Sequence, residues 1–200
     1  MALEITKIKT AIKQIPAPVK SFLLRALVFF LIWELAYNIF LLPNRVVDRP
    51  LSIFVANHTA SLINILEGNR LAYCTTEGSF IYKEGERIFY EKAVVFLGPN
   101  RLIGIADACN GLNLSVLFIG FIVVFPSKIY VKLIYVIVGI VAIMLLNIAR
   151  CAGLGIIHNS YPSLTDFAHH YVFKIVTYLA IFLMWYWFVK ITNKREANYA

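Results

Sequence analysis

The stretch Ala106-Asp107-Ala108-Cys109-Asn110-Gly111-Leu112 puts a thiol beside a small polar turn, directly before an apolar run that extends to Phe125. The run from Leu112 to Phe125 contains no charged residue. An uncharged apolar run of this kind is typical of a helix that lies in a membrane. The sequence therefore predicts that Cys109 lies where a polar turn enters a membrane.

The composition of the whole chain supports this interpretation. Of the 200 residues 60% are hydrophobic and 15% are charged, and the mean hydropathy is +0.74. A soluble domain has only about half apolar residues. The formal net charge of +8 does not indicate nucleic-acid binding, because the basic residues adjoin apolar runs and form no stripe with interleaved aromatics. We therefore expect membrane lipid, and no nucleic acid, among the partners.

The alternation of apolar and polar segments predicts a membrane all-α core of about four transmembrane helices with a small extracytoplasmic β-hairpin/α insertion. Five regions follow from it: a cytoplasmic basic amphipathic lead (1–21), a first transmembrane helix (22–42), an extracytoplasmic α/β insertion (43–106), a catalytic transmembrane core (107–191) and a cytoplasmic tail (192–200).

Within the core, three more transmembrane helices are expected at Cys109 to Phe125, Ile129 to Ala149 and His170 to Ile191, with a loop from Cys151 to Ala168. Gly153, Gly155 and Pro162 favour that loop.

The insertion is expected to contain both helix and sheet. Residues 57–66 form a short amphipathic pattern, and residues 79–82 and 87–90 are typical of a β-hairpin with its turn at Gly85. Residues 93–97 suggest another strand. Because so small a sheet is barely stable alone, it should rest on membrane helices or lipid.

The distribution of lysine and arginine predicts the orientation of the chain. These residues gather near the N-terminus, around Lys128 and at the C-terminus, whereas residues 151–168 contain none. By the positive-inside rule, both termini are then cytoplasmic. Cys109, Arg150 and the pair formed by His169 and His170 would consequently meet at the outer face of the membrane.

These side chains form a candidate catalytic site. A helix N-terminus and a nearby cation both favour a thiolate at Cys109. Arg150 could bind an oxyanion or a substrate carboxylate, and a histidine could transfer protons. Each residue also has an ordinary alternative: an inert buried cysteine, an arginine that snorkels to lipid headgroups, or a polar start of a helix.

Three short motifs resemble those of the exosortase/archaeosortase family of membrane-embedded cysteine transpeptidases. Ala108-Cys109-Asn110-Gly111-Leu112 resembles the cysteine motif, Asn147-Ile148-Ala149-Arg150 the arginine motif, and His169-His170-Tyr171-Val172-Phe173 the histidine motif. The family more often has serine where this chain has Asn110, and many of its members have more spanning helices. The chain therefore resembles a short member.

The resemblance implies a role for each residue of the candidate site. Cys109 would be the nucleophile, Arg150 would stabilise the oxyanion or orient the substrate, and one of His169 and His170 would shuttle protons. Because the histidines are adjacent, the sequence does not choose between them.

Three further residues are expected to help bind the substrate. Asn110 and Asn147 lie inside the matched motifs. Glu34 lies within the first apolar run, and a carboxylate at that depth usually faces a protein interior or a polar cavity.

The implied substrates are exported proteins with a C-terminal sorting tail, which consists of a short motif, a hydrophobic helix and a basic end. Cys109 would cleave this tail through a thioester, and an amine or water would release the product. The family is prokaryotic, so we expect a multi-pass protein of the inner or cytoplasmic membrane. No cofactor is expected, and a dedicated membrane partner remains open.

The main alternative is a non-catalytic membrane partner that binds an assembly complex through its extracytoplasmic sheet. A small-molecule carrier would be expected to show inverted repeats, which the sequence lacks. A zincin would require His-Glu-x-x-His. A metal site is disfavoured because its candidate ligands match no tight ligand spacing; they are Cys151, His158, His169 and His170. Whether Cys74 pairs with Cys151 stays open.

Overall fold

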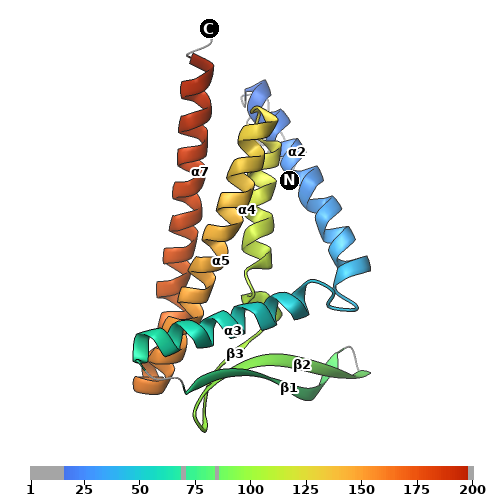
Figure 1. Cartoon of the computed structure of the whole chain (residues 1–200). Coiled ribbons are helices and arrows are strands. Elements are labelled where there is room, and N and C mark those ends of the chain that lie inside the picture. The colour runs from blue at the N-terminus through green and yellow to red at the C-terminus, as the bar shows by residue number, and fades with distance from the viewer. Residues whose placement is uncertain (1–15, 69–70, 84–85, 198–200) are drawn as a thin grey trace, which may run out of the picture.

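The computed structural model describes residues 16–68, 71–83 and 86–197. Apolar helices stand together as a bundle, one helix lies across the lower end of the bundle, and a small sheet lies below that helix (Figure 1). The bundle helices are α2 (Ala17–Ala36), α4 (Leu112–Val124), α5 (Ile129–Ser160) and α7 (Phe173–Ala197). The crossing helix is α3 (Asp48–Glu67).

Helix α2 begins earlier than the sequence predicts. It starts directly after Pro16 rather than at Phe22, with Pro18 in its first turn. A proline is tolerated there, because the first backbone N–H groups of a helix have no partner inside the helix. The helix continues as a π-helical turn, Tyr37–Leu41. The predicted amphipathic lead lies for the most part in residues 1–15, outside the described residues.

Helix α3 is longer than the expected segment 57–66. Asp48 lies in its first turn, where a carboxylate is favoured by the helix dipole. Gly68 ends the helix with a φ of 66°, a left-handed conformation that suits glycine. One face of α3 is buried against the sheet and α5, through Val55, Ala56, Ala60 and Ile63.

The sheet consists of three antiparallel strands in the order β1 (Ala72–Lys83), β2 (Glu86–Leu97) and β3 (Asn100–Ile105). The predicted hairpin pairing is confirmed, since Ser79 pairs with Tyr90. Its predicted turn at Gly85 lies outside the described residues. Residues 93–97 are not a separate strand, because they continue β2. The sequence did not predict β3, which leads directly to the cysteine turn.

Helix α4 is shorter than predicted, because a 3₁₀ turn (Asp107–Cys109) and Gly111 precede it. Its 13 residues fall short of the roughly 20 that cross a bilayer. Three stretches of the described chain are long and apolar enough to span a membrane: Ala17–Leu41, Ile129–Ser160 and Pro162–Lys194. The chain is therefore a multi-pass membrane protein, and the predicted number of four spanning helices is not confirmed.

Helix α5 corrects the prediction of a loop from Cys151 to Ala168. It continues past Arg150 to Ser160, and its glycines serve close packing instead of breaking the helix. A Cβ on Gly153 would lie 2.8 Å from the Phe173 ring. The chain then turns through short helical pieces at 162–164, 165–167 (α6) and 168–172 before α7 begins at Phe173, not at His170.

Two buried clusters hold these elements together. One lies among α4, α5 and α7 and includes Phe118, Ile143 and Phe188. The other joins α3, the sheet and α5, and includes Val95 and Ala152. The sheet therefore packs on protein, as the prediction of support by membrane helices required. Because β3 and α5 share this second cluster, the turn after β3 is held beside α5.

Candidate active site

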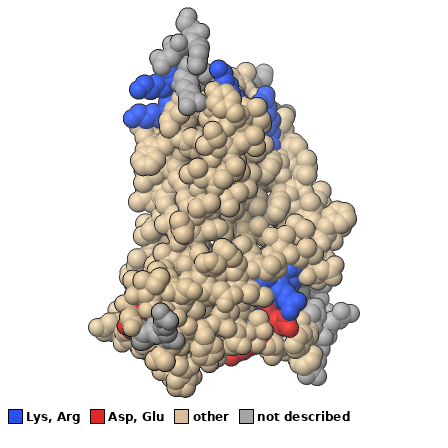
Figure 2. Space-filling view, in the orientation of Figure 1, with Lys and Arg blue, Asp and Glu red and all other residues tan. Residues whose placement is uncertain are grey.

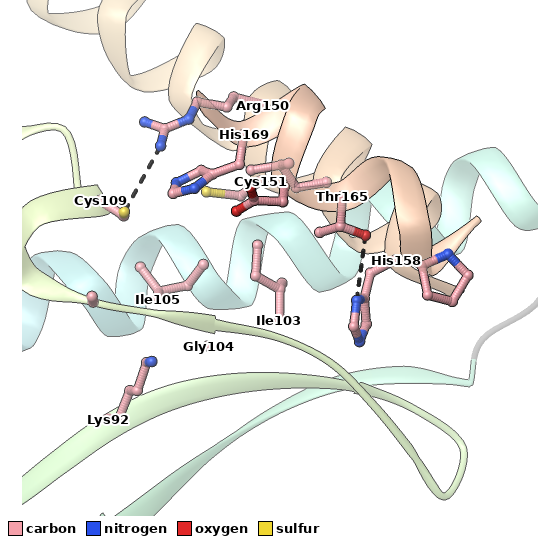
Figure 3. A pocket seen from close by; sticks show the side chains of 14 residues that line it. Lys92, Ile103, Gly104, Ile105, Cys109, Arg150, Cys151, His158, Thr165 and His169 are labelled. Carbon is pink, nitrogen blue, oxygen red and sulfur yellow. Dashed lines mark hydrogen bonds between the residues drawn. The ribbon is translucent and has the colours of Figure 1, made fainter. Parts of the chain in front are cut away.

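A pocket of about 450 Å³ lies between β3, the cysteine turn, α5 and the short helical pieces before α7 (Figure 3). Cys109, Arg150 and His169 all line it. They come from three separate parts of the sequence, and the fold brings them to the sheet end of the bundle. The predicted convergence of a cysteine, an arginine and a histidine is therefore present in the geometry.

The Cys109 thiol lies directly beside the Arg150 guanidinium. Arg150 Nη2 donates a hydrogen bond to Cys109 Sγ at 3.8 Å, which Figure 3 marks with a dashed line. Arg150 Nε is buried and has no hydrogen-bond partner among the described residues. This donor is therefore unused in the structure.

The turn that carries Cys109 differs from the predicted start of a helix. Cys109 ends a 3₁₀ turn, and its N–H already donates to Ala106 O at 2.8 Å. Helix α4 begins only at Leu112. The positive end of α4 is consequently not at Cys109, and the charged group that contacts its thiol is Arg150.

Asn110 and Asn147 hold the cysteine turn and do not line the pocket. Asn110 is fully buried; its Nδ2 donates to Asp48 Oδ1 at 2.8 Å, and its Oδ1 accepts from the Leu112 N–H at 2.9 Å. Asn147 Nδ2 donates to Cys109 O at 2.9 Å. Each side chain fixes backbone or a carboxylate next to the nucleophile, so each is placed to orient Cys109.

Gly111 completes the turn in a conformation that favours glycine. Its φ is 89°, which strains any side chain, and a Cβ there would lie 2.7 Å from Met144 Cε. The turn can therefore pack directly on α5.

The two adjacent histidines point to different surroundings. His169 lines the pocket, and Figure 3 shows its ring between the Arg150 and Cys151 side chains. His170 does not line the pocket; its Nδ1 lies 2.9 Å from Asp166 Oδ1 and 3.0 Å from Asp166 O. The structure thus separates residues that the sequence could not separate.

Glu34 is not brought to this pocket. It is exposed on α2, and its Oε1 accepts a hydrogen bond from Asn38 Nδ2 at 3.0 Å. Its expected contact with substrate therefore has no support from its position.

The alternative sites also lack support in the geometry. Among the described residues, no group of three or more acidic, cysteine or histidine side chains is arranged to hold a metal. Cys74 and Cys151 are both free thiols in the structure. Cys74 is half-buried in β1, and burial raises the pKa of its thiol, which makes it a poor nucleophile.

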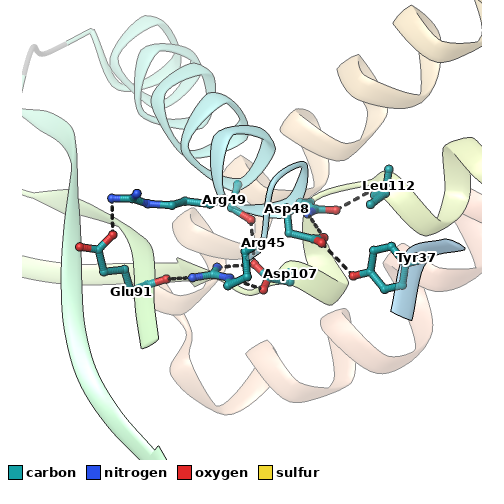
Figure 4. Close-up of polar contacts among 9 residues, drawn as sticks. Tyr37, Arg45, Asp48, Arg49, Glu91, Asp107 and Leu112 are labelled. Carbon is teal, nitrogen blue, oxygen red and sulfur yellow. Dashed lines mark hydrogen bonds and ion pairs between the residues drawn. The ribbon is translucent and has the colours of Figure 1, made fainter. Parts of the chain in front are cut away.

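A polar cluster behind the cysteine turn was not predicted (Figure 4). Arg45 forms a bidentate ion pair with Asp107, with Nε at 2.8 Å from Oδ2 and Nη2 at 2.5 Å from Oδ1. The third nitrogen, Nη1, donates to Glu91 O at 2.6 Å. The hydrogen bonding of the guanidinium to the Asp107 carboxylate raises the pKa of Arg45. Arg45 thereby links Asp107, two residues before Cys109, to the backbone of β2.

The same cluster ties the turn to α2 and α3. Asp48 accepts hydrogen bonds from the Tyr37 hydroxyl at 2.8 Å and from Asn110. Arg49 pairs with Glu91 at 2.5 Å. The π-helical turn after α2, helix α3 and strand β2 therefore meet at the residues that precede and follow Cys109. Such contacts can hold a nucleophile in one geometry.

Two more pocket residues were not predicted to lie in the thiol site, although His158 was considered as a metal ligand. Lys92 reaches the pocket from β2 over Gly104, where a Cβ would lie 2.5 Å from Lys92 Cε. His158 enters from the end of α5, with Nδ1 at 3.5 Å from Thr165 Oγ1. Lys92 precedes a run of buried residues in β2 and His158 lay in the predicted loop, so no local pattern marked them.

The bundle, the crossing helix and the pocket define a multi-pass membrane protein in which a cysteine, an arginine and a histidine line a pocket at one end. The model of the transmembrane exosortase family matches residues 17–187, from the start of α2 to well into α7. The chain belongs to this family of cysteine transpeptidases, and the resemblance seen in its motifs is confirmed. No curated protein and no solved structure matches the chain.

Proposed function

We propose that this chain is an exosortase-like transpeptidase or peptidase that removes the C-terminal sorting tail of exported proteins tethered in the membrane. The observation that supports this most is that Cys109, Arg150 and His169 line one pocket, in a chain that belongs to the transmembrane exosortases. The role of each residue below is part of the proposal.

In the proposed reaction, His169 takes the proton of the Cys109 thiol, and the resulting thiolate attacks the carbonyl carbon of the scissile peptide bond. A C–S bond forms, and the carbonyl oxygen becomes an oxyanion that the Arg150 guanidinium stabilises. When the C–N bond breaks, His169 gives a proton to the leaving amine and a thioester remains. An incoming amine or water then loses a proton to His169, attacks the thioester and releases Cys109.

The proposed topology places this pocket at the outer face of a prokaryotic cell membrane. Lysine and arginine gather at the opposite end of the bundle, near the C-terminus (Figure 2), and by the positive-inside rule that end is cytoplasmic. We count α4 as a fourth pass, since the tight connection after Val124 lies at that end and the cysteine turn at the other.

The substrate's own hydrophobic helix would deliver the scissile bond at the depth of Cys109. Positioning of this kind can lower a barrier by about 7–11 kcal/mol, so little further chemistry is required of the pocket. The cations Lys92 and Arg150 outnumber the one carboxylate, Asp166, among the residues that line the pocket, which suits the oxyanion of the proposed intermediate.

The test is to express Cys109→Ala and Cys109→Ser with a protein that carries a sorting tail, and to follow the size of that protein on a gel. Both variants should leave the precursor uncut at normal levels of the enzyme. Cys74→Ala is the matched control and should process it normally. If the Cys109 variants cut as the parent does, the proposal is wrong, and a non-catalytic partner that binds through its sheet becomes the better explanation.

A further inference from the structure

A second pocket lies at the end of the bundle opposite Cys109. It has a volume of about 520 Å³ and is formed by α2, the end of α4 and the first turn of α5. Most of its wall is apolar, including Val28 and Phe29 of α2 and Phe125 and Pro126 after α4. Its size lies within the range of small-molecule sites, about 300–1,000 Å³.

Two cations line this pocket without an acidic neighbour. Arg25 comes from α2 and Lys132 from α5, and no aspartate or glutamate is among the lining residues. Lys132 Nζ donates to Val123 O at 2.7 Å, so a backbone carbonyl fixes its position. Within the described part of the chain, Arg25 forms no ion pair; the ion pairs there are Arg45–Asp107, Arg49–Glu91, Arg101–Glu77 and His170–Asp166.

The two charges and the apolar wall together specify a ligand. Like charges across one pocket repel each other, and an anion between them removes that repulsion. A soluble anion gains little from an apolar wall, whereas the acyl chains of a lipid bury apolar area against it. Basic pockets between membrane helices bind anionic headgroups in this way.

We propose that this pocket binds an anionic phospholipid, with its phosphate between Arg25 and Lys132 and its acyl chains along α2. No residue of α2 is buried by protein, and it meets α4 through aromatic rings, with Phe29 and Phe30 over Gly120 and Phe22 against Phe121. A lipid in this pocket would join α2 to the α4–α5 connection. The proposal does not depend on the chemistry of Cys109.

The experiment is native mass spectrometry of the full chain in detergent with equal amounts of phosphatidylglycerol and phosphatidylcholine. We expect the parent to retain phosphatidylglycerol at least about tenfold more often, a preference of about 1.4 kcal/mol. The double variant Arg25→Gln, Lys132→Gln should lose this preference. The matched control removes two charges at the same end of the bundle but outside the pocket, with Lys190→Gln and Lys194→Gln, and should keep it.

Three outcomes would overturn the proposal. They are an unchanged preference in the double variant, an equal loss in the control pair, and displacement of the lipid by millimolar inorganic phosphate, which would show that the site recognises phosphate alone. Because the double variant could fold poorly, the single variant Arg25→Gln at an exposed position should also be measured. It should fold as the parent does and reduce the preference by at least about threefold, and an unchanged preference in this variant would equally refute the proposal.

Discussion

The two ends of this molecule treat their charged residues in opposite ways. At the sheet end, the arginines behind the cysteine turn meet carboxylates, as Arg45 does with Asp107 and Arg49 with Glu91. At the other end, Arg25 and Lys132 share a pocket that no acidic residue lines. Paired charges fix a backbone in place, whereas unpaired cations leave room for an anion from outside. The difference teaches that one end is built to hold its own geometry and the other to be completed by its surroundings.

The burial of apolar side chains also differs between the sheet end and helix α2. The sheet end has a buried cluster that joins α3, the sheet and α5, while α2 has no buried residue. Chemistry that needs atoms held in place should therefore be confined to the sheet end.

The largest effect should separate the two adjacent histidines at that end. We expect His169→Gln to slow processing of a tailed precursor by at least about 100-fold, because a general acid–base group contributes about 10²–10⁴. His170→Gln should change the rate only a few-fold, since His170 does not line the pocket and its ring pairs with Asp166. The measurement is a time course of precursor cleavage. A larger loss for His170→Gln would exchange the two roles, and small losses for both would remove histidine from the mechanism.

The second effect compares one arginine from each end. Arg45→Ala should lower the free energy of unfolding by about 3 kcal/mol, because it leaves the Asp107 carboxylate largely buried and unpaired. Arg25→Ala should change it by less than about 0.5 kcal/mol, since a surface substitution away from any partner costs little. Both are measured by denaturant unfolding in detergent without added lipid.

Equal losses for the two arginines would contradict the division between the ends. Asp107→Asn, which keeps the shape of the carboxyl group, serves as a second variant of the pair and should also destabilise the protein.

The sequence could predict the parts of this fold that local patterns determine. Apolar runs located α2, α5 and α7, and the spacing of lysine and arginine suggested which polar residues would meet. The pair of Arg45 and Asp107 could not be found, because 62 residues separate its members and neither stands in a distinctive pattern. Only the packing of β2, α3 and the cysteine turn brings them together.

The errors at α5 and α4 have a related cause. Gly153 and Gly155 break a helix when it is judged alone, but here they allow Phe173 and Ile63 to approach α5. In α4 the apolar run predicted the helix, while the buried contacts of Asn110 with Asp48 and of Asn147 with Cys109 decided where the helix could begin. Such tertiary contacts override local propensity.

A smaller effect should distinguish two asparagines. Asn110→Ala should cost about 2 kcal/mol of unfolding free energy, because it removes two buried hydrogen bonds and leaves Asp48 with one donor fewer. Asn38→Ala should cost only a few tenths of a kcal/mol, since its bonds to Glu34 are exposed to solvent or lipid headgroups. Thermal unfolding in detergent measures both. A cost for Asn38 as large as that for Asn110 would show that α2 is held as firmly as the cysteine turn.

The smallest effect is expected at Glu34. Glu34→Gln removes the charge but keeps an oxygen that can accept the hydrogen bond from Asn38. Because Glu34 is exposed on α2 and does not line the cysteine pocket, processing should stay within about twofold of the parent, equivalent to less than about 0.5 kcal/mol. The same cleavage time course gives the measurement, with His169→Gln as the reference for a large loss.

A loss of more than about tenfold, or 1.4 kcal/mol in the barrier, would show that α2 also contributes to processing. The substrate would then have to reach α2 as well as the pocket, unless Glu34 acts through Tyr37, whose N–H bonds to Glu34 O and whose hydroxyl donates to Asp48. Tyr37→Phe would separate these explanations. If it reproduces the loss, Glu34 acts through the cluster on the geometry of the cysteine turn. If it does not, Glu34 meets the substrate's hydrophobic helix directly, and the surface of α2 belongs to the binding site.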